Sequence, residues 1–189
     1  MTPVRAIALV GSLRAGSYNR ALWRAAQAHA PEGLLLEEGV IGDLPLYNDD
    51  LQPPSVPEWP APVGRLAAQV GAAEAVLFIS PEYNYSIPGV LKNAIDWVSR
   101  VQPSPFNDKP AGVMGVTGGL WGTSRMQYHL RQVGVFTNLH FLNRPEMLVA
   151  KGAEKFSAEG VLTDDPTRTV LVKFLTAFRD WALRFRRQP

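Results

Sequence analysis

The sequence predicts an α/β fold in which helices cover both faces of a five-stranded parallel sheet. Short apolar runs alternate along the chain with segments of helical periodicity, which is the pattern of repeated strand–helix units. Each apolar run is brief and is broken by Gly, Pro or charged residues. A length of 189 residues, of which 46% are hydrophobic, fits one domain with a sizeable core.

The first half of the chain predicts three strands, two helices and a long loop. Residues 4–10 form a continuous apolar run, and residues 17–30 form a helix whose apolar positions are Tyr18, Leu22, Ala25 and Ala26. Residues 34–40 are a second, weaker strand. Residues 41–62 hold six of the sixteen prolines, so we expect a long loop there. A short helix at 63–70, ended by Gly71, leads into a third strand at 75–80.

The second half continues the alternation. A helix at 88–101 has an apolar stripe made of Ile87, Val90, Leu91, Ala94, Val98 and Val101. A strand at 111–117, a helix at 123–133 and a fifth strand at 138–142 follow, and residues 146–162 are expected to form a small hairpin. The last helix is capped by Asp164 or Asp165, has Pro166 in its first turn and extends to about residue 185. Its predicted core face consists of Val170, Leu171, Phe174, Leu175, Phe178, Trp181, Ala182 and Phe185.

These elements predict a flavodoxin-like three-layer sandwich, with the strands in the order 2-1-3-4-5 and residues 1–189 in one domain. In such sheets ligands bind outside the carboxyl ends of the strands, where the strand order reverses. We therefore expect the site in the loops that follow the first, third and fourth strands.

Composition excludes several classes of protein. The chain has no cysteine, which rules out disulfides, thiol nucleophiles and cysteine-based metal sites and fits a cytoplasmic location. The net charge of +2 gives no reason to expect a nucleic-acid partner. No apolar run is long enough for a membrane span, and the start of the chain does not resemble a signal peptide. The carboxylates and the three histidines show no metal-ligand spacing, so we expect no metal site.

The loop after the first strand has the composition of an anion site. Residues 11–19 read GSLRAGSYN, with glycines that permit tight turns, the donors Ser12, Ser17 and Asn19, and the charged Arg14. The N-terminus of the following helix favours an anion such as a phosphate monoester. Position 17 is Ser where a nucleotide-triphosphate loop needs Lys, so that motif fails. The alternative is that Ser17 only caps the helix and Arg14 is a solvated loop residue.

The other two loops suit a flat ring. Residues 80–89 combine prolines, Asn84 and two tyrosines, Tyr83 and Tyr85, that could cover a heterocycle. The alternative is a surface turn whose tyrosines pack on a neighbouring helix or subunit. Thr117, Gly118 and Gly119 follow the fourth strand and would allow the backbone to approach a ligand closely, although a plain turn can also use Gly-Gly.

Together these residues resemble the NAD(P)H-dependent FMN reductases of flavodoxin-like fold, and the nearest branch resembles the bacterial chromate and quinone reductases. The resemblance covers residues 4 to about 150. It rests on the GSLR-x-x-S-x-N stretch at 11–19, on LPLYNDD at 44–50, and on PEYNYS-x-PG-x-LKNAIDW at 81–97. The last of these is the longest and most specific.

The resemblance implies an FMN site and its residues. Ser12, Leu13, Arg14, Ser17 and Asn19 would hold the phosphate, Pro81, Glu82, Tyr83 and Asn84 would contact the isoalloxazine, and Thr117, Gly118 and Gly119 would flank its other side. No side chain need be catalytic, because N5 of the flavin carries the chemistry. Family members form homodimers or homotetramers, and the subunit interface would include Tyr85, Arg125, Tyr128 and Glu146.

The implied activity is a ping-pong transfer of electrons from NADPH or NADH to a small-molecule acceptor. Quinones, free flavin, azo compounds and metal oxyanions such as chromate are the expected acceptors. Two alternatives remain open from sequence alone. One is a flavodoxin-type electron carrier without NAD(P)H activity, although such carriers are usually strongly acidic. The other is a sensor or interaction protein built on the same fold.

Overall fold

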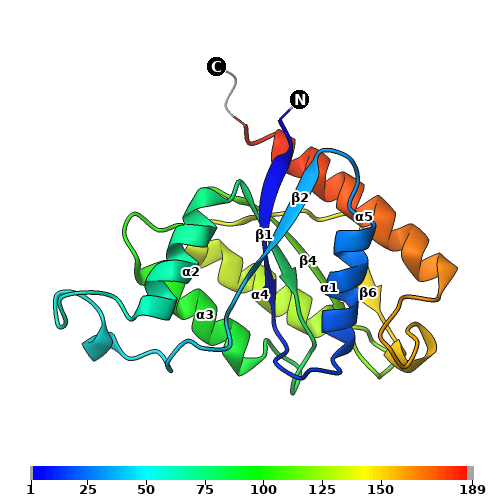
Figure 1. The fold of residues 1–189 in the computed structure, drawn as a ribbon, viewed down its shortest axis with the longest axis horizontal. Coiled ribbons are helices and arrows are strands. Elements are labelled where there is room, and N and C mark those ends of the chain that lie inside the picture. Colours follow the sequence, from blue (N-terminus) through cyan, green and yellow to red (C-terminus); the bar gives the residue numbers. More distant parts are fainter. Residues whose placement is uncertain (1, 187–189) are drawn as a thin grey trace.

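The computed structural model describes residues 2–186. Its sheet has the order β2-β1-β3-β4-β5, and β6 also pairs with β4; every pairing is parallel. The strands are β1 (Val4–Val10), β2 (Leu34–Gly39), β3 (Ala75–Ile79), β4 (Pro110–Val116), β5 (His140–Phe141) and β6 (Met147–Val149). The α-helices are α1 (Tyr18–Ala28), α2 (Ala61–Ala72), α3 (Gly89–Arg100), α4 (Ser124–Thr137) and α5 (Asp165–Leu183). The predicted strand order and flavodoxin-like fold are confirmed (Figure 1).

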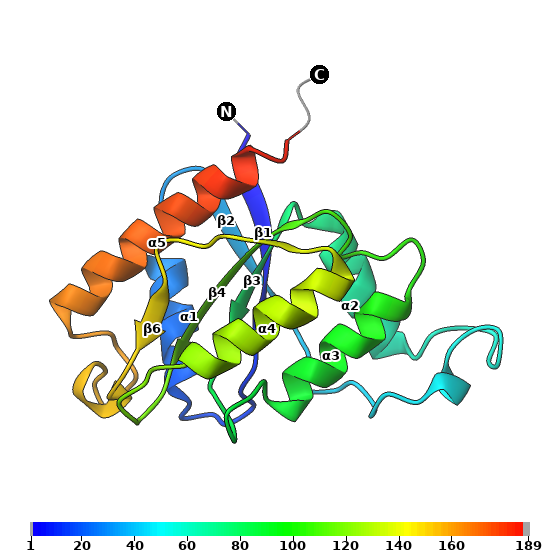
Figure 2. The same ribbon diagram turned by 180° about the vertical axis from the view of Figure 1, so that it is seen from behind.

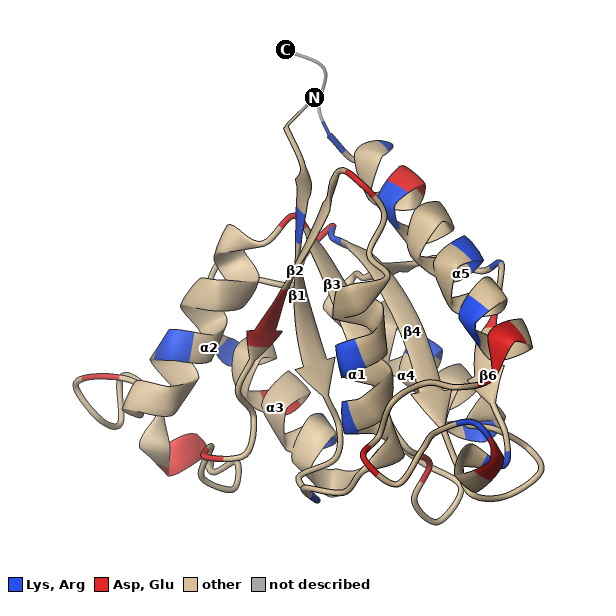
Figure 3. Ribbon diagram, turned by 45° about the vertical axis from the view of Figure 1, so that its right-hand side comes forward, with Lys and Arg blue, Asp and Glu red and all other residues tan. Residues whose placement is uncertain are grey.

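Helices cover both faces of the sheet (Figures 1 and 2), and the sheet separates two apolar cores, one under each helix layer. Successive side chains of a strand point to opposite faces. Ala8 and Val10 of β1 therefore pack in the core beneath α1 and α5, whereas Ile7 and Leu9 pack in the core beneath α2, α3 and α4. The predicted three-layer sandwich is thus the observed one. The outer faces of the helices carry much of the charge (Figure 3), and Arg20 of α1 forms an ion pair with Glu38 of β2.

The fifth position of the sheet differs from the prediction. The strand expected at 138–142 is reduced to β5, and the chain returns to the same edge of β4 as β6. Pro145 lies between the two strands, and a proline cannot donate the N–H that a continuous ladder would need. The hairpin expected at 146–162 is also wrong, because Met147–Val149 joins the main sheet as β6. Only a single antiparallel bridge, between Phe156 and Leu162, occurs in that segment.

Two helices extend beyond their predicted limits. Helix α2 begins at Ala61 because Pro62 is tolerated in a first turn, and it continues through Gly71 instead of ending there. Helix α4 continues to Thr137 and ends at Asn138, which takes the left-handed conformation common after a helix. Gly134 lies inside α4 because a Cβ there would come within 2.4 Å of the Phe141 ring.

Helix α5 confirms most of its predicted cap and core face. The Asp164 carboxylate accepts hydrogen bonds from the N–H and hydroxyl of Thr167, and these bonds lower the pKa of Asp164 to about 2. Leu171, Phe174, Leu175, Phe178 and Ala182 are buried. Val170 is 39% exposed and was wrongly placed in the core, since it lies beside this stripe and not within it. None of the helices in residues 2–186 is both long and apolar enough to cross a membrane.

The proline-rich loop after β2 is attached to α3. Trp97 donates from Nε1 to the Pro45 carbonyl at 2.8 Å, and Asn93 donates to the same oxygen at 2.9 Å. The Tyr47 N–H donates in turn to Asn93, and the Tyr47 ring meets Trp97 edge-on. Partial burial and the hydrogen bond to Asp49 raise the pKa of Tyr47. The conspicuous motif at 44–50 therefore anchors this loop through main-chain bonds to one helix.

Candidate functional site

The loops that follow β1, β3 and β4 emerge side by side at one end of the sheet, as predicted (Figure 1). The Gly11 N–H donates to the Ile79 carbonyl at 2.8 Å, which aligns the ends of β1 and β3. The Ser80 N–H donates to the Met114 carbonyl at 3.0 Å, which aligns the ends of β3 and β4. The start of β1 and the end of α5 lie at the opposite end of the molecule (Figure 1), so the carboxyl edge of the sheet is left to these loops.

Two positions near the carboxyl ends of β1 and β4, Gly11 and Gly115, have no room for a side chain. A Cβ on Gly115 would lie 2.1 Å from the Ser80 carbonyl oxygen, and a Cβ on Gly11 would lie 2.5 Å from the Ser80 hydroxyl. Contacts this short do not occur in folded proteins, so both positions must lack a side chain. The close packing brings the starts of all three loops together around buried Ser80.

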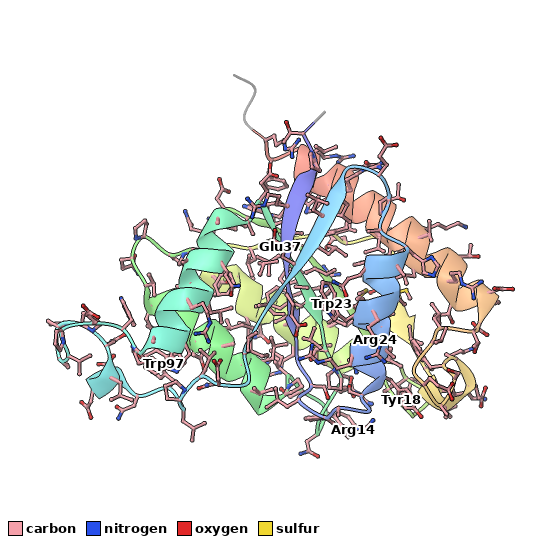
Figure 4. All side chains as sticks on the ribbon, viewed as in Figure 1. Arg14, Tyr18, Trp23, Arg24, Glu37 and Trp97 are labelled. Atoms are coloured by element: carbon pink, nitrogen blue, oxygen red, sulfur yellow. The ribbon has the colours of Figure 1, made fainter. Side chains whose placement is uncertain are left out.

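The first loop presents a row of free backbone donors. Among residues 2–186, no acceptor receives the N–H groups of residues 12–16, whereas the Ser17 N–H donates to the Arg14 carbonyl. No acidic residue lies in the first turn of α1. Arg14 has no ion-pair partner within the described chain; it is exposed at this end of the molecule (Figure 4), and its Nη1 lies beside Gly16. A loop of N–H donors at a helix N-terminus, with an unneutralised guanidinium, suits an anion.

The serines of this loop are placed differently from its larger side chains. Ser17 accepts the Asn19 N–H at 3.1 Å and so caps α1, which is the simpler role considered for it. Ser12 is buried, while the Leu13 side chain is 57% exposed. The capping role of Ser17 is therefore confirmed, and its role as a phosphate donor stays a prediction.

Asn19 joins the first and third loops. Its Nδ2 donates to the Val116 carbonyl at 2.9 Å, and its Oδ1 accepts the Val116 N–H at 3.0 Å. Asn19 is buried, and this pair of bonds fixes the start of α1 to the end of β4. The sequence suggested Asn19 as a phosphate donor but contained no sign of this reciprocal bond.

The second loop forms a tight turn at residues 83–86. The Tyr83 N–H donates to the Ser86 carbonyl at 3.1 Å, and the Ser86 N–H donates to the Tyr83 carbonyl at 2.9 Å. Asn84 and Tyr85 both have positive φ, 49° and 68°, as a type I′ turn requires. The turn holds the Tyr83 and Tyr85 side chains 50% and 71% exposed.

The residue before this turn and the last residue of the turn contact α4. Glu82, whose side chain is 7% exposed, accepts from Arg125 Nε at 2.6 Å and from the Met126 N–H at 3.1 Å. The Ser86 hydroxyl lies 2.7 Å from His129 Nδ1. Sequence reasoning missed His129 in this setting, and no pattern in the sequence signals a contact between residues 43 positions apart.

The third loop is held by the segment after β6. The Thr117 hydroxyl accepts the Gly119 N–H at 3.2 Å, the Lys151 N–H donates to the Gly119 carbonyl, and the Gly152 N–H donates to the Thr117 carbonyl. A Cβ on Gly118 would meet no atom within 4 Å, so this glycine faces open space. Leu120 and Trp121, which sequence reasoning did not select, follow it with 71% exposure each.

These loops make an open face that combines anion donors with exposed aromatic and aliphatic side chains. The exposed apolar side chains of these three loops are Leu13, Tyr83, Tyr85, Leu120 and Trp121. An exposed apolar group of this size beside an anion cradle suits a flat ring that carries a phosphate tail.

Comparison with known proteins places this chain among NAD(P)H-dependent reductases. Residues 4–154 match the family described as NADPH-dependent FMN reductase. The chain is 45% identical to an NAD(P)H-dependent FMN reductase of Pseudomonas aeruginosa over 183 residues, which is 97% of each chain. It is 38% identical to a quinone reductase of Escherichia coli K12 over 96% of each chain. The solved structure of the flavoenzyme NAD(P)H:(acceptor) oxidoreductase from Paracoccus denitrificans superposes with a TM-score of 0.86 at 38% identity, covering 96% of this chain and 99% of that one.

Proposed function

The chain belongs to the NADPH-dependent FMN reductase family, and on that premise we propose which part of the cofactor each of its three loops binds. It is an oxidoreductase that uses FMN as cofactor and NAD(P)H as electron donor, with quinone reductase activity among its relatives. This assignment favours an enzyme over the electron carrier and the sensor that the sequence left open.

We propose that the first loop holds the FMN phosphate. The supporting observation is the row of unpartnered N–H groups at residues 12–16 beside Arg14. Ser12, Leu13, Arg14 and Ser17 are the proposed contacts, through hydroxyl, backbone and guanidinium donors. Asn19 contributes by fixing this loop to the end of β4. The residues present therefore fit the phosphate of the cofactor.

We propose that the isoalloxazine ring lies between the second and third loops. Pro81, Glu82, Tyr83 and Asn84 form one side, and Thr117, Gly118 and Gly119 form the other. The open space over Gly118 supports a close backbone approach there. When bound, FMN supplies the redox chemistry by accepting hydride and passing electrons on, while the loops orient the ring and leave one face accessible.

We propose a ping-pong order in which the nicotinamide and the acceptor occupy the same exposed face in turn. The exposed side chains around the loops support a shared, unselective face, and thus a range of acceptors that includes quinones, free flavin, azo compounds and chromate. Initial rates measured at several fixed quinone concentrations while NADPH is varied test the order. Parallel double-reciprocal lines are expected, and converging lines would contradict it.

We propose that the enzyme is a homodimer or homotetramer and that Tyr85, Arg125, Tyr128 and Glu146 contribute to a subunit interface. Tyr85 and Tyr128 are 71% and 63% exposed, and the Tyr128 hydroxyl donates to Glu146 Oε1 at 3.1 Å on the surface of α4. Sedimentation equilibrium of the wild type and of Tyr128→Ala tests this surface. Unchanged mass in the variant would remove Tyr128 from the interface.

A further inference from the structure

The 83–86 turn has a conformation that its sequence does not favour. A type I′ turn needs positive φ at both central residues, which Gly and Asn adopt readily and bulky residues avoid. Asn84 suits the first position, but Tyr85 occupies the second with φ of 68°. Other contacts must therefore hold Tyr85 in this conformation.

Both ends of the turn are fixed to one face of α4. Glu82 is bonded to Arg125 at the first end, and Ser86 is bonded to His129 at the other. Arg125 and His129 are four positions apart, so they lie one above the other on the helix. Helix α4 thus contacts the residues immediately before and at the end of the turn.

Arg125 also contacts the centre of the turn. Its guanidinium carbon lies 3.7 Å from the centroid of the Tyr85 ring, while its Nε edge donates to Glu82. A guanidinium can use its edge for a carboxylate and its face for an aromatic ring at the same time. The Glu82 carboxylate is 7% exposed, which makes its pairing with Arg125 more effective than an exposed ion pair.

We propose that Arg125 is a positioning residue for the cofactor: through Glu82 and Tyr85 it holds the 83–86 turn in the shape that contacts the isoalloxazine ring. The inference rests on the proposed FMN site. It gives Arg125 a role within its own subunit, in addition to the one suggested at an interface. A residue that preorganises a contact loop removes the cost of ordering that loop on binding.

The test measures the turn and the cofactor separately. Amide hydrogen exchange of residues 82–87 in the FMN-free protein reports on the turn, and quenching of FMN fluorescence reports the dissociation constant. The single variants are Arg125→Ala, Arg125→Lys and Tyr85→Gly. The double variant combines Tyr85→Gly with Arg125→Ala. Gln132→Ala, an exposed position on the same helix, is the control.

Arg125→Ala is expected to speed exchange in the turn and to weaken FMN binding by about tenfold to a hundredfold, because the left-handed Tyr85 must then be re-formed on binding. Arg125→Lys keeps the positive charge but lacks the flat stacking face, so its exchange rate and FMN affinity should lie between those of the wild type and Arg125→Ala. Glycine accepts the left-handed conformation unaided, so Arg125→Ala should cost much less affinity in the Tyr85→Gly background.

The inference would be overturned if Arg125→Ala exchanged its turn amides and bound FMN as the wild type does. It would also be overturned if Arg125→Ala lost the same FMN affinity whether residue 85 is Tyr or Gly. If the wild-type protein binds no FMN, the proposed function fails and the inference fails with it. Normal wild-type binding with no effect of Arg125→Ala defeats the inference alone.

Discussion

The side-chain amide of Asn19 and the backbone of Val116 form a reciprocal pair of hydrogen bonds, at 2.9 and 3.0 Å, between the first turn of α1 and the end of β4. This pair sets the spacing between the loop proposed for the phosphate and the loop proposed for the ring. In the proposed site, cofactor placement would therefore depend on a residue whose side-chain amide bonds to the protein backbone.

Asn19→Ala should lower both stability and FMN affinity. The change leaves the buried N–H and carbonyl of Val116 without partners, which costs roughly 1–3 kcal/mol in the free energy of unfolding. Urea denaturation followed by fluorescence measures the stability, and FMN titration measures the affinity. Gln27→Ala, at an exposed position of α1, is the control. Equal stability of the Asn19 variant and the control would show that the two Asn19–Val116 hydrogen bonds do not stabilise the folded protein.

Arg14→Ala should weaken FMN binding by roughly tenfold to a hundredfold, since a hydrogen bond to a charged group is worth about 1.5–3 kcal/mol. Stability should change little because Arg14 is exposed. Titration with riboflavin, which lacks the phosphate, provides the decisive comparison. Arg14→Ala should leave riboflavin affinity unchanged, and an equal loss for both ligands would place Arg14 away from the phosphate.

Gly118→Ala separates a ligand-binding glycine from a plain turn glycine. A Cβ at Gly118 meets nothing within 4 Å in the protein, so the free energy of unfolding should change by less than about 0.5 kcal/mol. If the cofactor approaches the backbone there, the added methyl crowds it and weakens FMN binding roughly tenfold. Gly71→Ala in α2 is matched, since its Cβ also meets nothing within 4 Å, and it should bind FMN normally. Equal affinities in the two variants would argue for a plain turn.

Acid should destabilise the protein in part through Asp164. The hydrogen bonds from Thr167 hold the pKa of Asp164 at about 2, below its usual 3.8. Because the pKa is lowered in the folded state, this stabilisation is complete above the unfolded value and is lost as pH falls toward about 2.

Asp164→Asn keeps a capping oxygen but removes the titration. Its melting temperature should therefore fall less steeply than that of the wild type between about pH 5 and pH 2. Asp165→Asn, at the neighbouring more exposed carboxylate, is the control and should follow the wild type. Parallel curves for wild type and Asp164→Asn would contradict this role for Asp164.

The fold was predictable because strand and helix burial leaves a local pattern. The apolar run of β1 and the spacing of Leu171, Phe174 and Phe178 in α5 report burial directly. The division of the sheet edge into β5 and β6 was not predictable, because it depends on where the chain returns after Pro145. The order of the strands followed from connection rules that hold for all such sheets.

The site was predictable as three loops but not as a set of bonds. The bonds Asn19–Val116 and Glu82–Arg125 join residues 97 and 43 positions apart, and such pairs depend on tertiary packing. The left-handed Tyr85 was hidden for a different reason, since tyrosine is a poor indicator of positive φ. The residue types in the loops indicated the chemistry, whereas only the folded chain shows which of their side chains are buried and which are exposed.

The central claim is that the open face at the carboxyl edge holds FMN for reduction by NAD(P)H. The most direct test is the absorption spectrum of purified protein that has been incubated with FMN, desalted, and then mixed with NADPH in the absence of oxygen. The account predicts that flavin bands are retained and then bleach on addition of NADPH. Flavin that is lost on desalting, or that stays oxidised with both NADPH and NADH, would contradict it.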